Sequence, residues 1–424
     1  MTNRREKHWE KLDNTANIFP VIAGENMTNT YRICAVLKED IQPELLQEAV
    51  DIVTPKFPGF NVRLRSGVFW YYLEENGKKA PTVVEESQYP CRLIHPNLNR
   101  SYLFHVTYYK KRINLEVFHA LADGMGGVTF LRELIYQYLR LAHEDLRAKY
   151  SDDLSDETSL NREDSYLRNF QKACKAPYKA GRAFLIKGEH LPYHGFGVIA
   201  GLIPLQEIKQ VTKEKYHTTI NDYIVSAFIY STYQRFRGQI RMDRPVRVAV
   251  PVNLRPYFES ITTKNFFVMI SAEFYPEKED YSFEEILEIT RACLKEQMTR
   301  ENLEAIFSYN VSNEKVLIGR AVPLPVKNLA MKIVYTKNAL ANTTTITNIG
   351  KMSVSEDYGQ YIDRFYSFLP FSKGQDLKCA ITSFGEEMTV CFSSSLTDTS
   401  VPGGVFRQMA KDGIHVSVET NDLF

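Results

Sequence analysis

The alternation of hydrophobic and polar residues predicts helices and strands along most of the first half of the chain. Apolar residues recur at helical spacing in "PELLQEAVDIV". Two stretches, "FNVRLRSGVFWYYL" and "YLFHVTYYKKRINLEVFH", predict β-hairpins. In the second hairpin, alternate apolar residues and finally His119 share one face of a strand. An amphipathic helix is predicted over residues 126–143, so His119 ends a strand and Asp123-Gly124 lies in the turn before a helix.

The second half repeats this mixture of helices and strands. "TTINDYIVSAFIYSTYQRF" is apolar almost all round, which predicts a buried helix capped by Thr218 or Thr219. Ser282 and Glu285 have the spacing of a capping box for a further helix. Strands are predicted in "RPVRVAVPVNLRP" and in a hairpin, "KCAITSFGEEMTVCFSSSLTD". Between the halves, the acidic stretch 151–164 predicts a surface crossover. The order of elements indicates an α/β fold.

Two hairpin ends resemble each other. "LEVFHALADGMGGV" and "TVCFSSSLTDTSVPGGV" each combine a strand, a turn, an aspartate and Gly-Gly-Val, and they differ by an insertion. His119 then falls opposite Ser393. One interpretation is a tandem repeat whose second copy lacks the histidine; the other is coincidence between two apolar hairpins.

Composition restricts the class of protein. The 424 residues are enough for two domains, and 44% hydrophobic with 24% charged residues is typical of a globular protein. Basic and acidic residues number 52 and 51, so nothing favours nucleic acid. The six cysteines include no C-x-x-C, which fits reduced thiols in the cytoplasm better than disulfides or a metal site. We expect no transmembrane segment, because no run of about 18 apolar residues occurs, and no signal peptide, because the first residues are polar.

The H-x-x-x-D-G motif at His119, Asp123 and Gly124 suits general-base chemistry. A neutral imidazole accepts a proton near neutral pH, and a strand end beside a cleft can hold it still. Deprotonating a hydroxyl or amine lets it attack an acyl carbonyl, an assistance typically worth about 10²–10⁴ in rate. The carboxylate can lock the loop if a cation meets it, and the glycine allows a sharp entry to the helix. The alternative is a buried histidine that is only packed and hydrogen-bonded.

The motif "HALADG" resembles that of the chloramphenicol-acetyltransferase-like superfamily, which includes CoA-dependent acyltransferases and the condensation domains of peptide synthetases. The resemblance covers nearly the whole chain. "KLDNTANIFP" is similar to the start of alcohol-acetyltransferase-like members, "HTTINDYIVSAF" and "VPVNLRP" to the second-half helix and strand, and "TNIGK" to a late crossover strand. The nearest branches are the alcohol acetyltransferase-like and polyketide-associated acyltransferases. Condensation domains usually carry two adjacent histidines, whereas Phe118 stands here, and the D-F-G-W-G motif of BAHD enzymes is absent.

This resemblance implies a fold and an activity. We expect two chloramphenicol-acetyltransferase-like sandwich domains, residues 1–190 and 191–424, forming a pseudo-dimer with the active channel between them. Because the fused domains satisfy each other's interface, the protein is expected to be a monomer. The implied reaction moves an acyl group from a thioester, acetyl-CoA or another acyl-CoA, to a small-molecule alcohol or amine. The co-substrate is then acyl-CoA, with no permanently bound cofactor and no metal. The alternatives are a condensation-type enzyme that takes its donor from an acyl carrier protein, and a non-catalytic member that binds one.

The resemblance also assigns roles to residues. His119 is the expected general base, and Asp123 is expected to be structural and to pair with an arginine. In related two-domain members that arginine lies on the second-half strand, which points to Arg255, with Arg63 and Arg65 as rivals. An acyl-transfer site must also stabilise a developing oxyanion. Thr347 and Asn348 are the candidates for this role or for substrate contact, provided that their strand reaches the channel.

Overall fold

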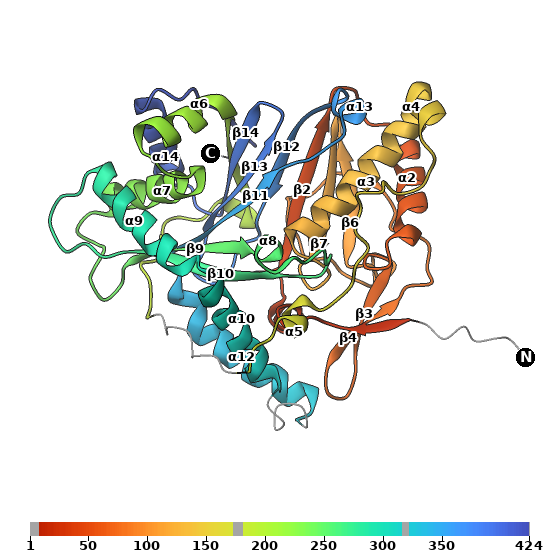
Figure 1. The fold of residues 1–424 in the computed structure, drawn as a ribbon, viewed down its shortest axis with the longest axis horizontal. Helices are drawn as coiled ribbons and strands as arrows, with labels where there is room; N and C mark the ends of the chain where they lie inside the picture. The colour runs from red at the N-terminus through yellow and green to blue at the C-terminus, as the bar shows by residue number, and fades with distance from the viewer. Residues whose placement is uncertain (1–7, 173–180, 316–321, 424) are drawn as a thin grey trace, which may run out of the picture.

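A computed structural model describes residues 8–172, 181–315 and 322–423, and it confirms the α/β class. Two halves lie side by side, each with a β-sheet on the inside and helices on the outside (Figure 1). Strands of both halves meet in the middle of the molecule, where the reds and oranges of the N-terminal part adjoin the blues of the C-terminal part. The predicted hairpins, buried helix and capping box are all present.

The first half contains a five-stranded sheet of order β12-β2-β7-β6-β5. Helices α2 and α3 cover its outer face with apolar side chains. The elements of this half are β1 (Trp9–Lys11), α1 (Phe19–Ile22), β2 (Thr30–Leu37), α2 (Pro43–Lys56), β3 (Val62–Ser66), β4 (Tyr71–Glu75), β5 (Val84–Glu85), β6 (Phe104–Tyr109), β7 (Arg112–Phe118), α3 (Gly124–Ala142), α4 (Glu144–Lys149) and α5 (Ser165–Arg168). A separate three-stranded sheet has the order β1-β4-β3.

The second half contains a seven-stranded sheet of order β10-β9-β11-β13-β14-β8-β15. Helices α7, α9 and α14 pack on its outer face. Its elements are β8 (Gly197–Pro204), α6 (Leu205–Gln210), α7 (Ile220–Phe236), β9 (Val246–Asn253), α8 (Arg255–Phe258), β10 (Phe267–Phe274), α9 (Phe283–Gln297), α10 (Arg300–Lys315), α12 (Leu324–Asn338), β11 (Thr344–Lys351), α13 (Glu356–Gly359), β12 (Ile362–Phe368), β13 (Leu377–Phe384), β14 (Glu387–Ser394), α14 (Ser400–Lys411) and β15 (Ser417–Thr420).

One strand of the second half of the sequence belongs to the first sheet. Strand β12 pairs antiparallel with β2, with Phe365 opposite Ala35. The hydroxyls of Thr382 and Thr389, on β13 and β14, donate to the carbonyl of Phe365 at 3.2 and 2.9 Å. The two sheets are therefore joined by a strand that is exchanged between them. A domain division near residue 190 describes the order of the chain and stays a proposal.

The apolar side chains form three layers. Each sheet has one large core between it and its outer helices. A smaller cluster lies where the inner faces of the two sheets meet, and we call this contact the inter-sheet seam. Its buried members are Cys34, Cys91, Phe196, Ala200, Leu202, Tyr366, Phe368 and Cys391. Residues that alternate along one strand thus serve either an outer core or the seam.

The strand orders agree with an internal repeat. The run β12-β2-β7-β6 in the first sheet corresponds to β15-β8-β14-β13 in the second. In both halves a strand followed by a helix adjoins the second strand of a hairpin, and that hairpin leads into a long helix. The similarity between "LEVFHALADGMGGV" and "TVCFSSSLTDTSVPGGV" therefore falls on structurally corresponding segments.

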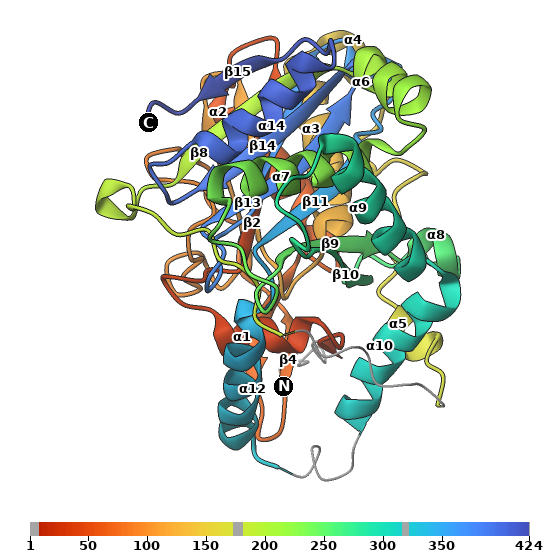
Figure 2. The same cartoon turned by 90° about the vertical axis from the view of Figure 1, so that its left-hand side faces the viewer.

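Helices α10 and α12 extend away from the two sheets, and α12 lies beside α1 (Figure 2). The backbone N–H of Leu324, at the start of α12, donates to the carbonyl of Val68 at 2.8 Å. Among the helices of the described residues, none combines the length and the apolar character that crossing a bilayer requires. Of the six cysteines, the five in described positions are free, and Cys174 lies outside the described residues.

Candidate active site

His119 lies at the junction of the two halves. It follows the last residue of β7, and its backbone N–H donates to the carbonyl of Asn29 at 2.8 Å, which fixes the strand end. Its ring stacks on Phe19 with a centroid distance of 4.5 Å and an interplanar angle of 23°. Tyr31 of the first half and Phe267 of the second contact it at 5.2 and 5.6 Å. The half-buried ring is thus enclosed by aromatic side chains from both halves.

A chain of hydrogen bonds sets the tautomer of this ring. The backbone N–H and the side-chain amide of Asn265 donate to Oδ2 of Asp13, at 3.2 and 2.9 Å. The amide oxygen of Asn265 therefore faces the other way, 3.0 Å from Nδ1 of His119, and accepts its hydrogen. Within the described residues, Nε2 of His119 has no hydrogen-bond partner, and in this tautomer it carries the free lone pair.

Burial shifts the pKa values of this chain of groups. Removal from water lowers the pKa of His119 below its usual value, and the nearby charge of Lys378 lowers it further, while the carboxylate of Asp123 opposes both. Burial also raises the pKa of Asp13 to about 6, although its hydrogen bonds with Asn265 and Ala16 act in the opposite direction. The imidazole is therefore neutral at neutral pH, the form that can accept a proton.

Asp123 is tied to Arg255, the arginine that the sequence singled out. Two parallel hydrogen bonds join them, Nη1 to Oδ2 at 2.8 Å and Nη2 to Oδ1 at 3.0 Å. Oδ2 of Asp123 also accepts from the backbone N–H of Phe266, and Oδ1 accepts from that of Gly126 at the start of α3. This carboxylate is 5% exposed, and its partners Arg255 and Phe266 belong to the other half. The rivals Arg63 and Arg65 both pair with Glu74 across the β3–β4 hairpin.

The glycine of the motif and the two glycines that follow it differ in how much space surrounds their Cα atoms. Gly124 begins α3, and a methyl group there would meet Ile349 only at an ordinary 3.9 Å. A methyl group at Gly126 would lie 2.5 Å from the carbonyl oxygen of Thr263, and one at Gly127 would lie 2.6 Å from the Tyr31 hydroxyl. The close approach of the helix to the second half therefore requires Gly126, and its packing on Tyr31 of the first half requires Gly127, whereas Gly124 is not required by close contacts.

Thr347 and Asn348 lie on β11, which crosses toward the first half. Thr347 is half-buried and pairs with Ala380 of β13, on the face of the sheet that looks into the seam. Asn348 points to the opposite face, is exposed, and accepts a hydrogen bond from the N–H of Gly350 at 2.9 Å. No described hydrogen bond connects either residue to His119. The structure thus brings Thr347 to the seam and turns Asn348 away from it.

Two polar residues on the inner face of the second sheet were not among the predicted site residues. Lys378 at the start of β13 is 9% exposed, and Ser393 opposite it on β14 is 1% exposed. The hydroxyl of Ser393 lacks a hydrogen-bond partner among the described residues. Burial lowers the pKa of Lys378 to about 8. Its charge is one of the causes that lower the pKa of His119.

A cavity of about 980 Å³ opens at one end of the seam. Its walls come from both halves, with Thr28 and Cys91 from the first and Phe196, Asp376 and Ser395 from the second. Thr28 precedes Asn29, whose carbonyl holds the backbone of His119, and its hydroxyl donates to the carbonyl of Cys91 at 2.6 Å. The cavity therefore adjoins the loop on which His119 depends.

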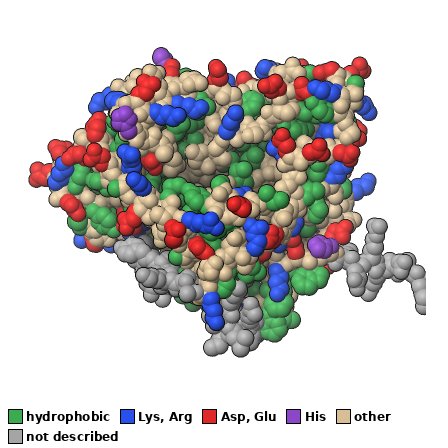
Figure 3. Space-filling view, in the orientation of Figure 1, with side chains coloured by type: hydrophobic (Ala, Val, Ile, Leu, Met, Phe, Trp, Pro, Cys, Tyr) green, Lys and Arg blue, Asp and Glu red, His purple; other side chains and the backbone are tan. Residues whose placement is uncertain are grey.

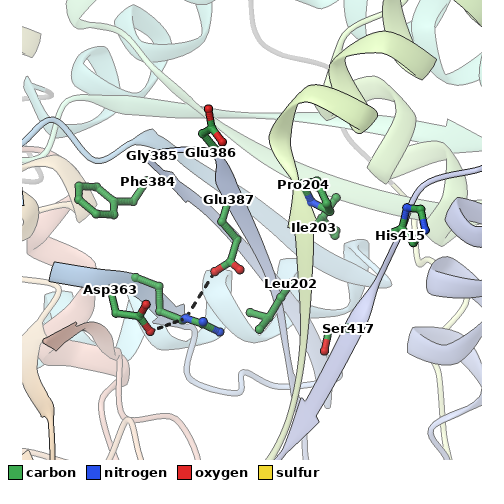
Figure 4. A pocket seen from close by; sticks show the side chains of 11 residues that line it. Leu202, Ile203, Pro204, Asp363, Phe384, Gly385, Glu386, Glu387, His415 and Ser417 are labelled. Carbon is green, nitrogen blue, oxygen red and sulfur yellow. Dashed lines mark hydrogen bonds and ion pairs between the residues drawn. The ribbon is translucent and has the colours of Figure 1, made fainter. Parts of the chain in front are cut away.

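A second cavity, of about 620 Å³, lies where the β13–β14 hairpin, β8 and β12 come together (Figure 4). Arg364 and Glu387 form an ion pair at 3.4 Å within it, and His415 lines its far side. None of the aromatic or polar neighbours of His119 borders this cavity. Charged side chains of both signs are intermixed over the face of the molecule drawn in Figure 3, in keeping with a net charge of +1.

Asn265, Asp13 and Lys378 are the neighbours of the site that sequence reasoning missed. Asn265 directly precedes a strand, and Asp13 lies inside "KLDNTANIFP", yet neither forms a pattern with His119. Lys378 stands at the start of an otherwise apolar strand, a place where a lysine is usually exposed. A lone lysine in "KCAITSF" was the only available signal for it.

The fold has counterparts among solved structures. Over 97% of this chain and 99% of the other, it is similar to the TRI101 protein of F. sporotrichioides, solved with Coenzyme A and T-2, with a TM-score of 0.63 and 12% identity. The TRI3 trichothecene 15-O-acetyltransferase of Fusarium sporotrichioides aligns over 96% and 95% of the two chains, with a TM-score of 0.61 and 9% identity. The condensation domain of the Monacolin K polyketide synthase MokA aligns over 96% of each chain, with a TM-score of 0.57 and 9% identity.

Neither a comparison with models of protein families nor one with curated proteins gives a match. At such low identity the structural similarity establishes the fold. The chain has the chloramphenicol-acetyltransferase-like fold, with two sandwich halves arranged as a pseudo-dimer, as the resemblance of its motif implied.

Proposed function

We propose that this protein is an acyltransferase that moves an acyl group from a thioester, acetyl-CoA or another acyl-CoA, to an alcohol or amine, with His119 as the general base. The observation that carries the proposal is the arrangement of the imidazole. Its Nδ1 is held by Asn265 at 3.0 Å, its pKa is lowered, and it lies between the two halves. The likeness to an acetyltransferase and to a protein solved with Coenzyme A supports the same reaction class.

In the proposed reaction, Nε2 of His119 takes the proton of the acceptor O–H or N–H. The oxygen or nitrogen then forms a bond to the thioester carbonyl carbon, and the carbonyl electrons move to an oxyanion. When this intermediate collapses, the C–S bond breaks and the thiolate leaves with the proton that His119 had accepted. Thr347 is the candidate oxyanion donor, because its side chain lies on the seam face of β11.

Asp123 and Arg255 act in this scheme as positioning residues. The carboxylate fixes the first turn of α3, the loop of Phe266 and the arginine together. Because β7 and α3 flank His119, this clamp fixes the imidazole relative to the second half. The pair is buried, with side chains 8% and 12% exposed, so it is screened little by solvent.

The proposal is tested by measuring thiol release from acetyl-, butyryl- and octanoyl-CoA, with and without a panel of simple alcohols and amines. We expect acceptor-dependent release by the wild-type protein. His119→Ala should remove it while leaving the melting temperature unchanged. Full activity in this variant would show that the imidazole is not the base.

The likeness to a condensation domain favours a second donor class, an acyl group on a carrier protein. The same variants should then be assayed with acylated carrier protein in place of acyl-CoA. Transfer from the carrier protein alone would replace the CoA donor and keep the role of His119. Absence of transfer from both donors would favour a non-catalytic member that binds a carrier protein.

A further inference from the structure

Lys378 is a buried cation without a counter-charge in the described part of the chain. Its neighbours Leu377 and Cys379 point into the outer core of the second half, so its own side chain lies on the inner face of the sheet. The side chain is 9% exposed, and no described group lies within hydrogen-bond or ion-pair distance of its ammonium group. Burying an unpaired ammonium group is costly, so proteins rarely retain one unless something binds to it.

A second unsatisfied polar group adjoins this lysine. Ser393 is the direct cross-strand neighbour of Lys378 in the β13–β14 ladder. Directly paired residues on adjacent strands project to the same face, with Cβ atoms about 4.5–5.5 Å apart. The Ser393 hydroxyl is 1% exposed and has no hydrogen-bond partner among the described residues. The chain thus places an ammonium group and a hydroxyl, both able to donate, side by side.

The two groups lie one step inward from the seam cavity. Asp376 and Ser395 line that cavity; they lie just beyond the ends of β13 and β14, two residues from Lys378 and Ser393 respectively. Asp376 accepts a hydrogen bond from the hydroxyl of Ser395 at 3.2 Å and forms no ion pair with Lys378. Cys91, also in the cavity wall, is the remaining acidic neighbour, but burial raises the pKa of its thiol, which stays uncharged. No described group therefore neutralises the lysine.

The position of Lys378 limits what could bind to it. Lys378 projects from the inner face of the sheet, inward of a cavity whose wall includes Thr28, next to the residue that holds the backbone of His119. A group bound to Lys378 would therefore lie inside the seam, on the side of the cavity that adjoins the His119 loop. The diphosphate of an acyl-CoA is separated from its thioester by the whole pantetheine arm, so it cannot occupy this place during transfer. An anion at Lys378 must belong to the acceptor or to the acyl chain itself.

We propose that Lys378 and Ser393 form a subsite for a carboxylate, carried by the acceptor or by the acyl group that this protein transfers. This inference rests on the proposed function, because it names the substrate class of the same site. Lys378 supplies the charge and Ser393 a directional hydrogen bond, a pair of donors suited to one anionic oxygen group. The subsite distinguishes charged substrates from neutral ones of the same shape, because a neutral occupant leaves the lysine unpaired.

The test measures binding by calorimetry with one substrate at a time, so that no turnover occurs. In the acceptor arm, a series of short ω-hydroxy acids is compared with the corresponding carboxamides. In the donor arm, succinyl-CoA is compared with butyryl-CoA. The variants are Lys378→Met, Lys378→Arg and Ser393→Ala. Lys351→Met is the matched control, because this lysine is exposed on the neighbouring strand β11.

In one arm, the wild-type protein should bind the carboxylate about tenfold or more tightly than its neutral counterpart, the ratio typical of a hydrogen bond to a charged group. Lys378→Met should reduce this ratio to near one, Ser393→Ala should reduce it partly, and Lys378→Arg and Lys351→Met should preserve it. Lys378→Met should melt no lower than the wild type, because it loses an unpaired buried charge. Equal binding of acid and neutral partner in both arms, or a preference that survives Lys378→Met, would overturn the proposal.

This experiment separates the subsite from the reaction. A carboxylate preference that depends on Lys378, in a protein that transfers no acyl group, would uphold the subsite and refute the proposed function. Acyl transfer without a carboxylate preference would uphold the proposed function and refute the subsite.

Discussion

The hairpin β6–β7 with α3 and the hairpin β13–β14 with α14 occupy corresponding places in the two halves, yet they carry different chemistry. The first ends in His119, and its aspartate reaches across to Arg255 of the other half with two short hydrogen bonds. The second has Ser393 at the matching position. Its aspartate, Asp398, accepts a hydrogen bond from the N–H of Ser400 at the start of α14 and pairs at 3.0 Å with Arg235 of its own half, at the surface.

The difference shows how one architecture can form the two walls of a single site. In the first unit, His119 and Asp123 form hydrogen bonds with residues of the other half, which fix their side chains. The second unit keeps its aspartate outside and presents Lys378 and Ser393 to the seam. The inner faces of the two sheets meet at the seam, so each unit can specialise: one for proton transfer and the other, as proposed, for recognition.

The largest expected effect comes from making the first unit like the second. His119→Ser should lower kcat/KM for acyl transfer by about 10²–10⁴, the usual value of general-base assistance. Thiol release under steady-state conditions measures it. His415→Gln, at an exposed position far along the chain, is the control and should remain active. A His119→Ser variant within a factor of two or so of the wild type would contradict the assignment.

The two aspartates should differ in stability. Asp123→Asn leaves Arg255 buried without its counter-charge and should cost about 3–5 kcal/mol in free energy of unfolding. Asp398→Asn disrupts a largely exposed pair and should cost at most about 1 kcal/mol. Denaturant unfolding followed by fluorescence compares the two variants. Equal losses would show that the interdomain clamp contributes no more than the surface pair.

Asn265→Ala tests the positioning of the ring. Without the amide that accepts from Nδ1, the imidazole can rotate or change tautomer, and kcat should fall on the order of 10²-fold, as expected for a misplaced catalytic group. KM should change little, because Asn265 is bonded to His119 and Asp13. Steady-state kinetics separates the two constants. An unchanged kcat would mean that the tautomer is held by other contacts.

The smallest effect should appear in the pH dependence. Lys378 lowers the pKa of His119 and Asp123 raises it, so Lys378→Met should move this pKa upward. The base works in its neutral form and activity is lost as pH falls through its pKa. The acid limb of kcat/KM should therefore move to higher pH in this variant. A limb that stays in place, or moves to lower pH, would show that the lysine charge does not reach the imidazole.

The sequence alone predicted the elements and the ion pair of the motif for different reasons. Hairpins, helices and caps depend on local periodicity, so "TTINDYIVSAFIYSTYQRF" and the pair Ser282–Glu285 indicated their structures directly. Arg255 was named through the resemblance of "VPVNLRP", which placed it in order along the chain. Thr347 and Asn348 show a limit of that approach, because neighbours on a strand face opposite ways and cannot both reach the seam.

The rest of the site depends on contacts that no local pattern encodes. Asn265 is separated from His119 by 146 positions, and only the packing of β10 against the first half brings them together. Lys378 looks like an exposed strand start until the other sheet covers it. Such residues can be recognised as part of the site only from the contacts between the two halves in the folded protein.

Because β12 comes from the second half of the sequence and pairs in the first sheet, the chain itself links the two halves. Separating the halves would break the hydrogen bonds from Thr382 and Thr389 to Phe365 of β12, and a cut after residue 190 would leave β2 as an unpaired sheet edge open to aggregation. We therefore expect that neither fragment is soluble on its own.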